Sequence, residues 1–527
     1  MTIPFPTSLR EAAQIGDGEV RYLLYAIITD STNVILPSQP PVNVELYFGN
    51  IFFMDRKSTL SDMYYKPFEP RLITPINLTQ SMFEPGKIGG LIRPSGGTIS
   101  LSNSDGELDY LLDYSWDKKP IRLYMLRGFT DDDAFSDHFQ IWSGITLGVS
   151  ATTSTIDIVV GDRLSKLDRD FPPNIHTTGE RIPITLGKVY NVPPLLINES
   201  SNIYQVHDGA VTSIDAVYES GEALTLTTDY TVDAANGKFT LVSAPTGVIT
   251  ADVTNDITIF QAGPGLPGGY ITNGAGGIML ELLTTYAGLS TSGTADVEES
   301  EFRRAGVNQY EHGIYYSEKV TVLDAINSMA ESIGAIIYPA FGGGLKVAVP
   351  EFPSSNPSSA DADPITDGEI LDIQMLPTER FSGVSATVKY KRNYRVLSEN
   401  ELSASPADRD FATREWRSVT GALTSLTWGT GYSGLRDIEI NSTITNQTDA
   451  STEQTRIANY YLRDAKIFRV RMKTNPLYLE IGGSVELKSS RFGLTDGSGN
   501  GYPMLILSKF DDLEANEVTL ELMGETN

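Results

Sequence analysis

The stretch "LSNSDGELDYLLDYSWDKKPIRLY" (residues 101–124) decides how the first part of the chain is interpreted. It could begin a calcium loop, or it could turn a corner between two strands. A calcium loop of the helix–loop–helix kind needs a carboxylate at position 1, glycine at position 6 and glutamate at position 12. With Gly106 at position 6, Leu101 and Leu112 fall where the two ligands are required. The spacing therefore argues against a calcium loop.

The same stretch predicts a crossover between two strands. Its acids recur every fourth residue and would share one solvated face of a helix: Asp109, Asp113 and Asp117. Leucines occupy the opposite face: Leu108, Leu111 and Leu112. We therefore expect a strand, a turn at Asp105-Gly106, a short helix seated on these leucines, and a return strand from Pro120.

The whole chain favours β-structure in several domains. Its 527 residues exceed a single core, because cores stop growing below about 300 residues. The 47 glycines and 25 tyrosines are typical of strands joined by tight turns. Apolar residues recur at every second position in many segments, as half-buried strands require. The predicted fold class is mainly β with α+β insertions, including two domains that resemble β-barrels or sandwiches.

Proline, glycine and low-complexity segments divide the chain into six predicted parts. They are an N-terminal arm (1–40), a first β-barrel-like domain (41–168), a proline-rich linker (169–198), a small β-hairpin domain (199–265), an α+β domain (266–365) and a C-terminal β-barrel-like domain (366–527). The C-terminal domain is expected to contain one helix, at 451–465.

Two local patterns predict single elements. Asn236-Gly237 lies between two strand patterns and predicts a hairpin, because both residues tolerate positive φ. Thr321 is a suitable helix N-cap and Gly334 a suitable stop. The apolar residues between them form one stripe: Val322, Ile326, Met329, Ala330 and Ile333.

Composition argues against several classes of protein. The 40 Lys and Arg against 67 Asp and Glu give a net charge of −27, which repels the phosphates of nucleic acids. The absence of cysteine excludes disulfides, thiolate catalysis and cysteine-bound metals. No stretch approaches the ~18 apolar residues that span a membrane, and the N-terminus lacks a secretory pattern. We therefore expect no stable membrane insertion.

The motifs do not reveal a catalytic set. No nucleophile elbow, Walker loop or H-E-x-x-H is present, and no pair of acids is singled out for glycoside cleavage. We therefore predict no catalytic, cofactor-binding or metal-binding residues and no cofactor. One question stays open at the acidic loop 131–138. Asp131, Asp133 and Asp137 could ligate Ca²⁺, although a solvated loop between two strands is the simpler interpretation.

Several segments together resemble tail proteins of long-tailed bacteriophages and prophages. "GTISLSNSDGELDYLLDYSWDKKPIRLY" (97–124) resembles a recurring segment in which a strand, an Asn-x-Asp-Gly turn, a short Leu-rich helix and a second strand follow in order. "ITLGKVYNVPPLLIN" (184–198) and the hairpins after it resemble the next segment of the same proteins. The run from "TRIANYYLRDA" to "NEVTLELMG" (455–524) is similar to the end of tail-tip and baseplate hub proteins. The resemblance covers most of residues 40–527.

This resemblance implies a tail-tip or baseplate hub protein of siphovirus-like phages and prophages. In such proteins two β-barrel-like domains per subunit let a homotrimer present six similar surfaces to the tail tube. The implied partners are further copies of the chain, distal tail or tail tube proteins, the C-terminus of the tape-measure protein, and tail tip or fibre proteins. The chain would be made in the host cytoplasm and lie in the virion. DNA would pass an acidic lumen during ejection without specific binding.

Two other functions are alternatives to a structural, non-enzymatic hub. A cell-wall-degrading tail protein would release glycan from the host envelope. A receptor-binding tail protein would expose an aromatic patch, for which the chain has four tryptophans: Trp116, Trp142, Trp416 and Trp428. Because these lie in or beside strand patterns, we expect them in cores.

Overall fold

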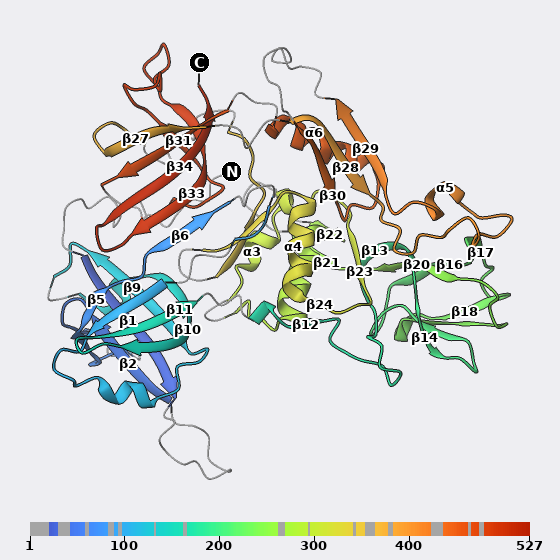
Figure 1. Cartoon of the computed structure of the whole chain (residues 1–527), viewed down its shortest axis with the longest axis horizontal. Coiled ribbons are helices and arrows are strands. Elements are labelled where there is room, and N and C mark those ends of the chain that lie inside the picture. The colour runs from blue at the N-terminus through green and yellow to red at the C-terminus, as the bar shows by residue number, and fades with distance from the viewer. Residues whose placement is uncertain are drawn as a thin grey trace, which may run out of the picture.

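The computed structural model describes residues 20–29, 43–57, 63–82, 89–92, 97–130, 133–161, 166–261, 269–292, 296–340, 344–353, 364–377, 383–422, 436–461, 465–473 and 479–526. Figure 1 shows two β-rich units at one side of the molecule, the N-terminal one blue and the C-terminal one red. A green β-rich lobe lies at the opposite side. Helices α4 (Val322–Ser332) and α6 (Gln447–Tyr461) belong to the section between them.

The first β-unit is built on one sheet. Its strands are β1 (Val20–Thr29), β2 (Asn43–Gly49), β3 (Phe53–Met54), β4 (Pro67–Pro70), β5 (Leu72–Thr74), β8 (Gly97–Ser102), β9 (Pro120–Arg127), β10 (Phe139–Ala151) and β11 (Thr155–Gly161). Their order is β3-β4-β2-β1-β9-β10-β11-β8-β5, and all neighbours are antiparallel except β2 and β4. Within the described residues, the end strands β3 and β5 do not pair with each other.

Strands from both halves of this sheet share one core, so the sheet must curl around it. Leu24 of β1, Ile158 of β11 and Ile99 of β8 are fully buried in the same cluster. Alternate residues of each strand point to this side, as strand geometry requires. The opposite face of β1 and β9 is covered by Phe53 and Phe68, from β3 and β4.

The crossover predicted at residues 101–124 is present. After β8 the chain turns at Gly106, whose φ is +73°, and forms the 3-10 helix η1 (Asp109–Asp113) before β9. Asn103 is buried and ties the turn together: its Oδ1 accepts from the Leu108 amide at 2.8 Å, and its Nδ2 donates to Asp109 at 2.7 Å. The carboxylates expected to be solvated are exposed: Asp109, Asp113 and Asp117.

One detail of the crossover prediction is wrong. Leu108 and Leu111 are buried, but Leu112 is 44% exposed. A 3-10 helix has about three residues per turn, so residues three apart share a face and the following residue points elsewhere. The leucine pattern was interpreted with α-helical geometry, which would have placed all three on one side.

The green lobe is formed by two sheets that share a core around the fully buried Phe239 and Val253. Its strands are β13 (Ile184–Val192), β14 (Leu195–Asn198), β15 (Ile203–Gln205), β16 (Ser213–Glu219), β17 (Glu222–Ala223), β18 (Tyr230–Asp233), β19 (Lys238–Leu241), β20 (Ile249–Asn255) and β23 (Gly313–Tyr316). The strand orders are β17-β16-β20-β13-β23 and β14-β15-β19-β18.

Residues 169–198, predicted as a linker, contain β13, which pairs with β20 on one side and β23 on the other. The prolines that suggested a linker flank this strand: Pro183 precedes it and Pro193 follows it. Proline cannot donate to a sheet ladder and is tolerated at strand ends. This stretch therefore holds the lobe together and does more than connect two domains.

The hairpin predicted at Asn236-Gly237 is present, but its turn differs from the expected one. Strands β18 and β19 pair across the 3-10 turn η4 (Ala234–Asn236), and Gly237 has φ +59°. Asn236 does not adopt positive φ; its side-chain amide donates to Asp233 at 2.8 Å. A 3-10 turn closed by a left-handed glycine replaces the two-residue turn.

The middle section combines short strands with helices. Its elements are β7 (Gly90–Leu91), β12 (Asp170–Phe171), β21 (Thr258–Gln261), β22 (Gly269–Thr272), α2 (Ala275–Glu281), the π-helix η5 (Leu282–Tyr286), α3 (Glu299–Phe302), η6 (Ala305–Val307), β24 (Val320–Thr321), α4, β25 (Ile336–Pro339) and β26 (Leu345–Ala348). Helix α4 begins as predicted, because Thr321 and Asp324 cap each other reciprocally. It ends before Gly334, whose φ is +59°.

The C-terminal part contains two sheets. Its elements are β27 (Ile370–Leu376), β28 (Gly383–Tyr390), α5 (Arg409–Ala412), β29 (Arg417–Ala422), β30 (Arg436–Asn441), α6, β31 (Ala465–Met472), β32 (Ser484–Leu487), β33 (Tyr502–Asp512) and β34 (Glu517–Glu525). The sheet orders are β27-β31-β34-β33-β32 and β29-β28-β30. Helix α6 begins at Gln447, before the predicted start at 451. The mainly β fold class is confirmed.

The first and last β-units are joined directly. Strand β6 (Leu78–Ser81) leaves the first unit and pairs antiparallel with β33 of the C-terminal sheet (Figure 1). In return, Leu513, which follows β33, is buried in the core of the first unit. Its carbonyl accepts from the Tyr22 hydroxyl at 2.7 Å, and its amide donates to Asn77 Oδ1 at 3.3 Å. Each unit therefore supplies a part that completes the other.

Candidate functional site

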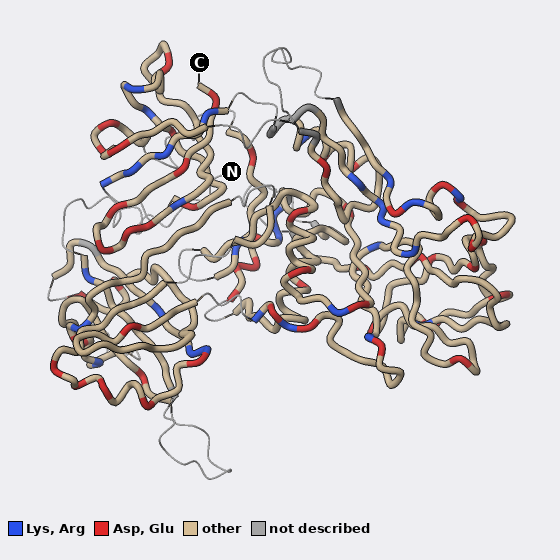
Figure 2. The backbone as a smooth tube through the Cα atoms, viewed as in Figure 1, with Lys and Arg blue, Asp and Glu red and all other residues tan. Residues whose placement is uncertain are grey.

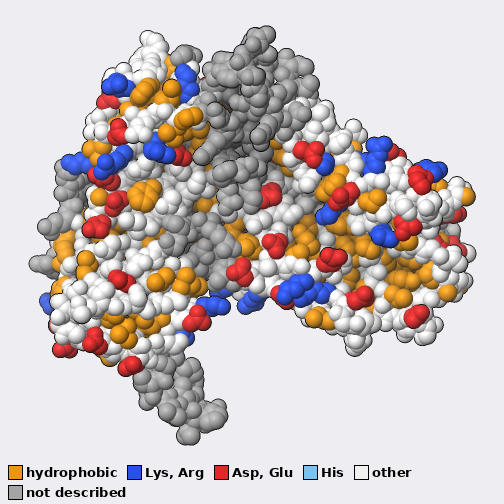
Figure 3. Space-filling model, viewed as in Figure 1, with side chains coloured by type: hydrophobic (Ala, Val, Ile, Leu, Met, Phe, Trp, Pro, Cys, Tyr) orange, Lys and Arg blue, Asp and Glu red, His pale blue; other side chains and the backbone are white. Residues whose placement is uncertain are grey.

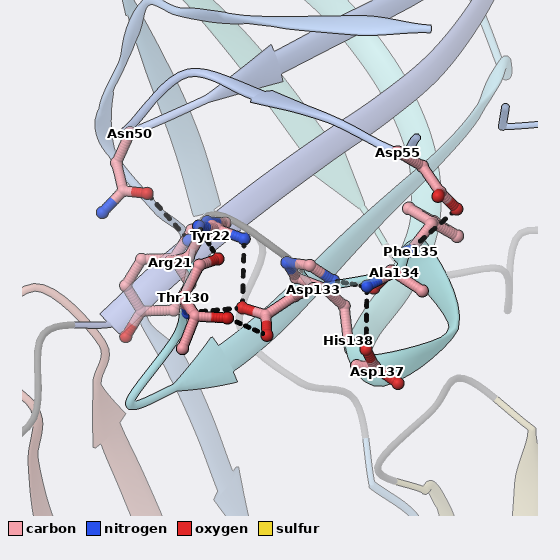
Figure 4. Close-up of polar contacts among 10 residues, drawn as sticks. All are labelled: Arg21, Tyr22, Asn50, Asp55, Thr130, Asp133, Ala134, Phe135, Asp137 and His138. Atoms are coloured by element: carbon pink, nitrogen blue, oxygen red, sulfur yellow. Dashed lines mark hydrogen bonds and ion pairs between the residues drawn. The ribbon is translucent and has the colours of Figure 1, made fainter. Parts of the chain in front are cut away.

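The acidic loop before β10 is closed by its own carboxylates (Figure 4). Asp133 accepts from the amide and hydroxyl of Thr130 at 2.7 and 2.9 Å. Asp137 accepts from the amide of Ala134 at 2.8 Å. Asp131 lies outside the described residues, so the calcium interpretation of 131–138 stays a prediction. The described contacts give this loop a structural role between β9 and β10.

Behind the loop lies a buried polar cluster that ties it to β1. The Arg21 side chain, almost fully buried, donates to the carbonyl of Thr130 at 3.1 Å and lies 3.5 Å from the Asp133 carboxylate. Its guanidinium also stacks over the ring of Phe129, 4.1 Å from the centroid. Asp55, fully buried, accepts from the amide of Phe135 at 3.0 Å. Figure 4 shows Arg21, Asp55, Thr130, Asp133 and Phe135 around the start of the loop.

His138 is the buried histidine of this cluster. Its Nδ1 lies 3.2 Å from the carbonyl of Ala134, and its ring packs 4.7 Å from that of Phe53. Burial lowers the pKa of His138 to about 4; the positive charge of Arg21 adds to this effect, and the negative charge of Asp133 opposes it. The imidazole is therefore neutral in the folded protein at neutral pH.

This neutral histidine makes stability depend on pH. The unfolded chain binds a proton at His138 below about pH 6.5, whereas the folded chain does so only near pH 4. The stabilising contribution is therefore complete above pH 6.5 and decreases as the pH falls towards 4, by up to about 3 kcal/mol. We expect His138→Phe to flatten this part of the stability profile, measured by urea unfolding at a series of pH values. The matched control His176→Phe, at a half-buried loop histidine, should keep the wild-type slope; equal slopes in all three proteins would contradict the prediction.

The other residues considered in the sequence lie in structural settings. His207 is buried and its Nδ1 accepts from the amide of Thr185 at 3.0 Å, which gives it a structural role. Trp116 and Trp142 are buried in the first core. Trp416, also expected in a core, is half-buried, and Trp428 lies outside the described residues. Among the residues that the structure describes, no three His, Asp or Glu side chains gather into a group that could hold a metal.

A polar pocket of about 500 Å³ lies where the lobe meets the middle section and β28. Its walls come from β13, β23, α4, the segment after β28 and the end of β30. Basic and aromatic side chains line it: Lys188, Tyr190, Lys389, Lys391, Arg392 and Trp416. Three acidic side chains line it as well: Asp324, Glu331 and Glu415. In Figure 2, basic positions gather where the C-terminal segment passes over the lobe.

The sequence did not predict this pocket, although it contains one signal. The segment 388–395, "VKYKRNYR", concentrates basic residues in a strongly acidic chain. Its partner β13 lies about 200 residues earlier, and the bridge between Tyr190 and Asn393 brings the two together. The Asn191 amide reinforces this contact by donating to Asn393 Oδ1 at 2.7 Å. The lining therefore carries charges of both signs, and its lysine and arginine side chains are the groups that can attract an anion.

Across the described part of the chain, every helix is too short or too polar to cross a membrane.

Comparison with known proteins gives likenesses of structure only. No protein-family model and no curated protein matches the sequence. The 43 kDa tail protein of prophage MuSo2 from Shewanella oneidensis is similar over 87% of this chain and 94% of its own, at 10% identity and a TM-score of 0.37. A tail protein from Neisseria meningitidis MC58 is similar over 88% of this chain and 94% of its own, at 9% identity and a TM-score of 0.37. A chain of the virion of a native gene transfer agent is similar over 66% of this chain and 85% of its own, at 10% identity and a TM-score of 0.42. At such identities and TM-scores, the likeness by itself assigns neither family nor function.

Proposed function

We propose that this chain is a structural, non-enzymatic component of a bacteriophage tail tip or baseplate. It forms a hub ring that joins the tail tube to distal tip or fibre proteins. The ring surrounds the path of the tape-measure protein and the DNA. The observation that carries the proposal is the direct union of the first and last β-units.

This union fixes two β-units within one subunit. Strand β6 extends the C-terminal sheet, and Leu513 fills the core of the first unit. The segments whose sequences resemble hub proteins, 97–124 and 455–524, fall in or beside these two units. A trimer of such subunits would present six β-units around its axis, as a match to a six-fold tube requires.

The charge of the chain supports passage of DNA without adsorption. The net charge is −27, and on the face shown in Figure 3 acidic and basic side chains are interspersed, without a broad basic surface. A polyphosphate gains no counterion release from such a surface. An acidic lumen would therefore let DNA slide through the ring.

The trimer is tested by measuring the mass of the purified full-length chain in solution, alone and with a tail tube protein. We expect a particle of three times 57.5 kDa, with three-fold symmetry and an axial channel in electron microscopy images. A chain that stays monomeric under both conditions, or a ring whose channel is lined by Lys and Arg, would overturn the hub proposal.

The non-enzymatic part of the proposal has its own test. Purified protein is incubated with peptidoglycan and with capsular polysaccharide, and soluble glycan is measured. We expect no release above a heat-denatured sample. Release of glycan would favour the alternative of a cell-wall-degrading tail protein.

A further inference from the structure

The polar pocket contains two lysines that differ from the other basic residues around them. Lys389 forms an ion pair with Glu439, and Arg392 forms one with Glu415 at 3.1 Å. Lys188 and Lys391 have no such partner: among the described residues, no carboxylate oxygen lies within 4.0 Å of either ammonium group. The pocket therefore holds two ammonium groups without a direct ion pair, although Asp324 and Glu331 also line it.

Both lysines are held in place by the same aromatic ring. The ammonium of Lys391 lies 4.5 Å from the centroid of Tyr190, and that of Lys188 lies 5.8 Å from it. Lys391 also lies 4.8 Å from the ring centre of Phe411. These cation–π contacts fix the two charges on one wall of the pocket. Long side chains positioned in this way lose less entropy when they bind an anion.

The position of Lys391 is unfavourable without a ligand. Burial and the nearby charges of Arg417 and Lys188 lower its pKa, and Asp252 and Asp408 only partly oppose this. A desolvated ammonium without a hydrogen-bonded anion costs free energy. An anion in the pocket would remove this cost and would interact with both lysines.

We propose that the pocket binds the carboxylate groups of an acidic protein segment. Lys188 and Lys391 would each donate to a carboxylate. The exposed amide of Asn441, at the end of β30 on the pocket wall, could hydrogen-bond the backbone of the segment. A volume of about 500 Å³ has room for a few residues of such a segment.

Other anions fit less well. A sugar acid would need a free aromatic face, but Tyr190 is covered by the lysines and the ring of Trp416 carries the guanidinium of Arg392 at 5.3 Å. A nucleic acid would bring a long run of phosphates against a chain of charge −27. A short acidic segment brings only a few charges, and these can enter the pocket itself.

The test uses the full-length chain and a fluorescent oligo-glutamate peptide, with binding followed by anisotropy. We expect binding that Lys188→Gln with Lys391→Gln weakens by about tenfold or more. The matched control is Lys238→Gln with Lys488→Gln, which changes the net charge equally at two lysines that do not line the pocket. Lys188→Arg with Lys391→Arg should retain binding, and thermal unfolding shows whether each variant is folded.

Four results would overturn the proposal. The first is no detectable binding of oligo-glutamate to the wild type. The second is equal weakening in the pocket variant and in the control variant, which would indicate long-range charge and not a site. The third is tighter, pocket-dependent binding of glucuronate or of a single-stranded oligonucleotide, which would assign the pocket to a different class of ligand. Binding of oligo-glutamine as tight as that of oligo-glutamate would likewise exclude carboxylate recognition.

Discussion

Replacing Gly313 by alanine is expected to destabilise the five-stranded sheet of the lobe by about 4 kcal/mol. Gly313 of β23 faces Gly187 of β13 across the ladder. A Cβ at Gly313 would overlap the carbonyl oxygen of Lys188 and come within 2.9 Å of its backbone nitrogen. Because these are backbone atoms within a ladder, no side chain can move aside, and the two strands must separate.

Hydrogen exchange of β13 and β23 measures this effect. A loss of about 4 kcal/mol corresponds to roughly a thousandfold lower protection of their amides. The matched control is Gly148→Ala in β10, where an added Cβ meets nothing within 4 Å. If the amides of β13 are protected equally in Gly313→Ala and in Gly148→Ala, the ladder tolerates the added side chain.

Replacing Leu513 by alanine is expected to destabilise the first β-unit by about 3–5 kcal/mol. Leu513 is only 3% exposed and fills a core made almost entirely of residues from the other end of the chain. The substitution leaves a cavity between two units, where neither backbone can easily collapse. It also loosens the segment whose carbonyl accepts from the Tyr22 hydroxyl.

Tryptophan fluorescence during urea unfolding follows this core, because Trp116 and Trp142 are buried in it. We expect Leu513→Ala to unfold at a lower urea concentration than the wild type. Leu112→Ala, whose side chain is 44% exposed, should change the free energy of unfolding by less than about 0.5 kcal/mol. Similar midpoints for both variants would mean that the two units are not energetically coupled through Leu513.

Local patterns in the sequence predicted local structure well. The turn at Gly106 and the cap at Thr321 depend on neighbouring residues alone, and both are present. Errors arose where one pattern fits two geometries. Leu112 fits an α-helical face but is turned outward in a 3-10 helix, and the prolines around β13 mark strand ends as well as linkers.

The pocket could not be predicted in the same way, because its walls are distant in sequence. Lys188 and Lys391 meet only because β13 lies beside the segment after β28. Nothing in either segment alone specifies this neighbour. The burial of His138 likewise depends on the whole first unit. Several of its neighbours in the sequence are aspartates, and these favoured a solvated loop.

The exchange of parts between the two ends of the chain also bears on biosynthesis. Tyr22 and Leu513, which share a hydrogen bond, are 491 residues apart. During synthesis the N-terminal unit emerges first, and its core lacks one apolar side chain until Leu513 has been made. The contact between Tyr22 and Leu513 forms slowly, because it closes a very long loop. The entropic cost of closing this loop is only slightly larger than that of a loop of half the length. A chain that terminates before β33 would lack both this strand and Leu513, so the core of its N-terminal unit would stay unfilled.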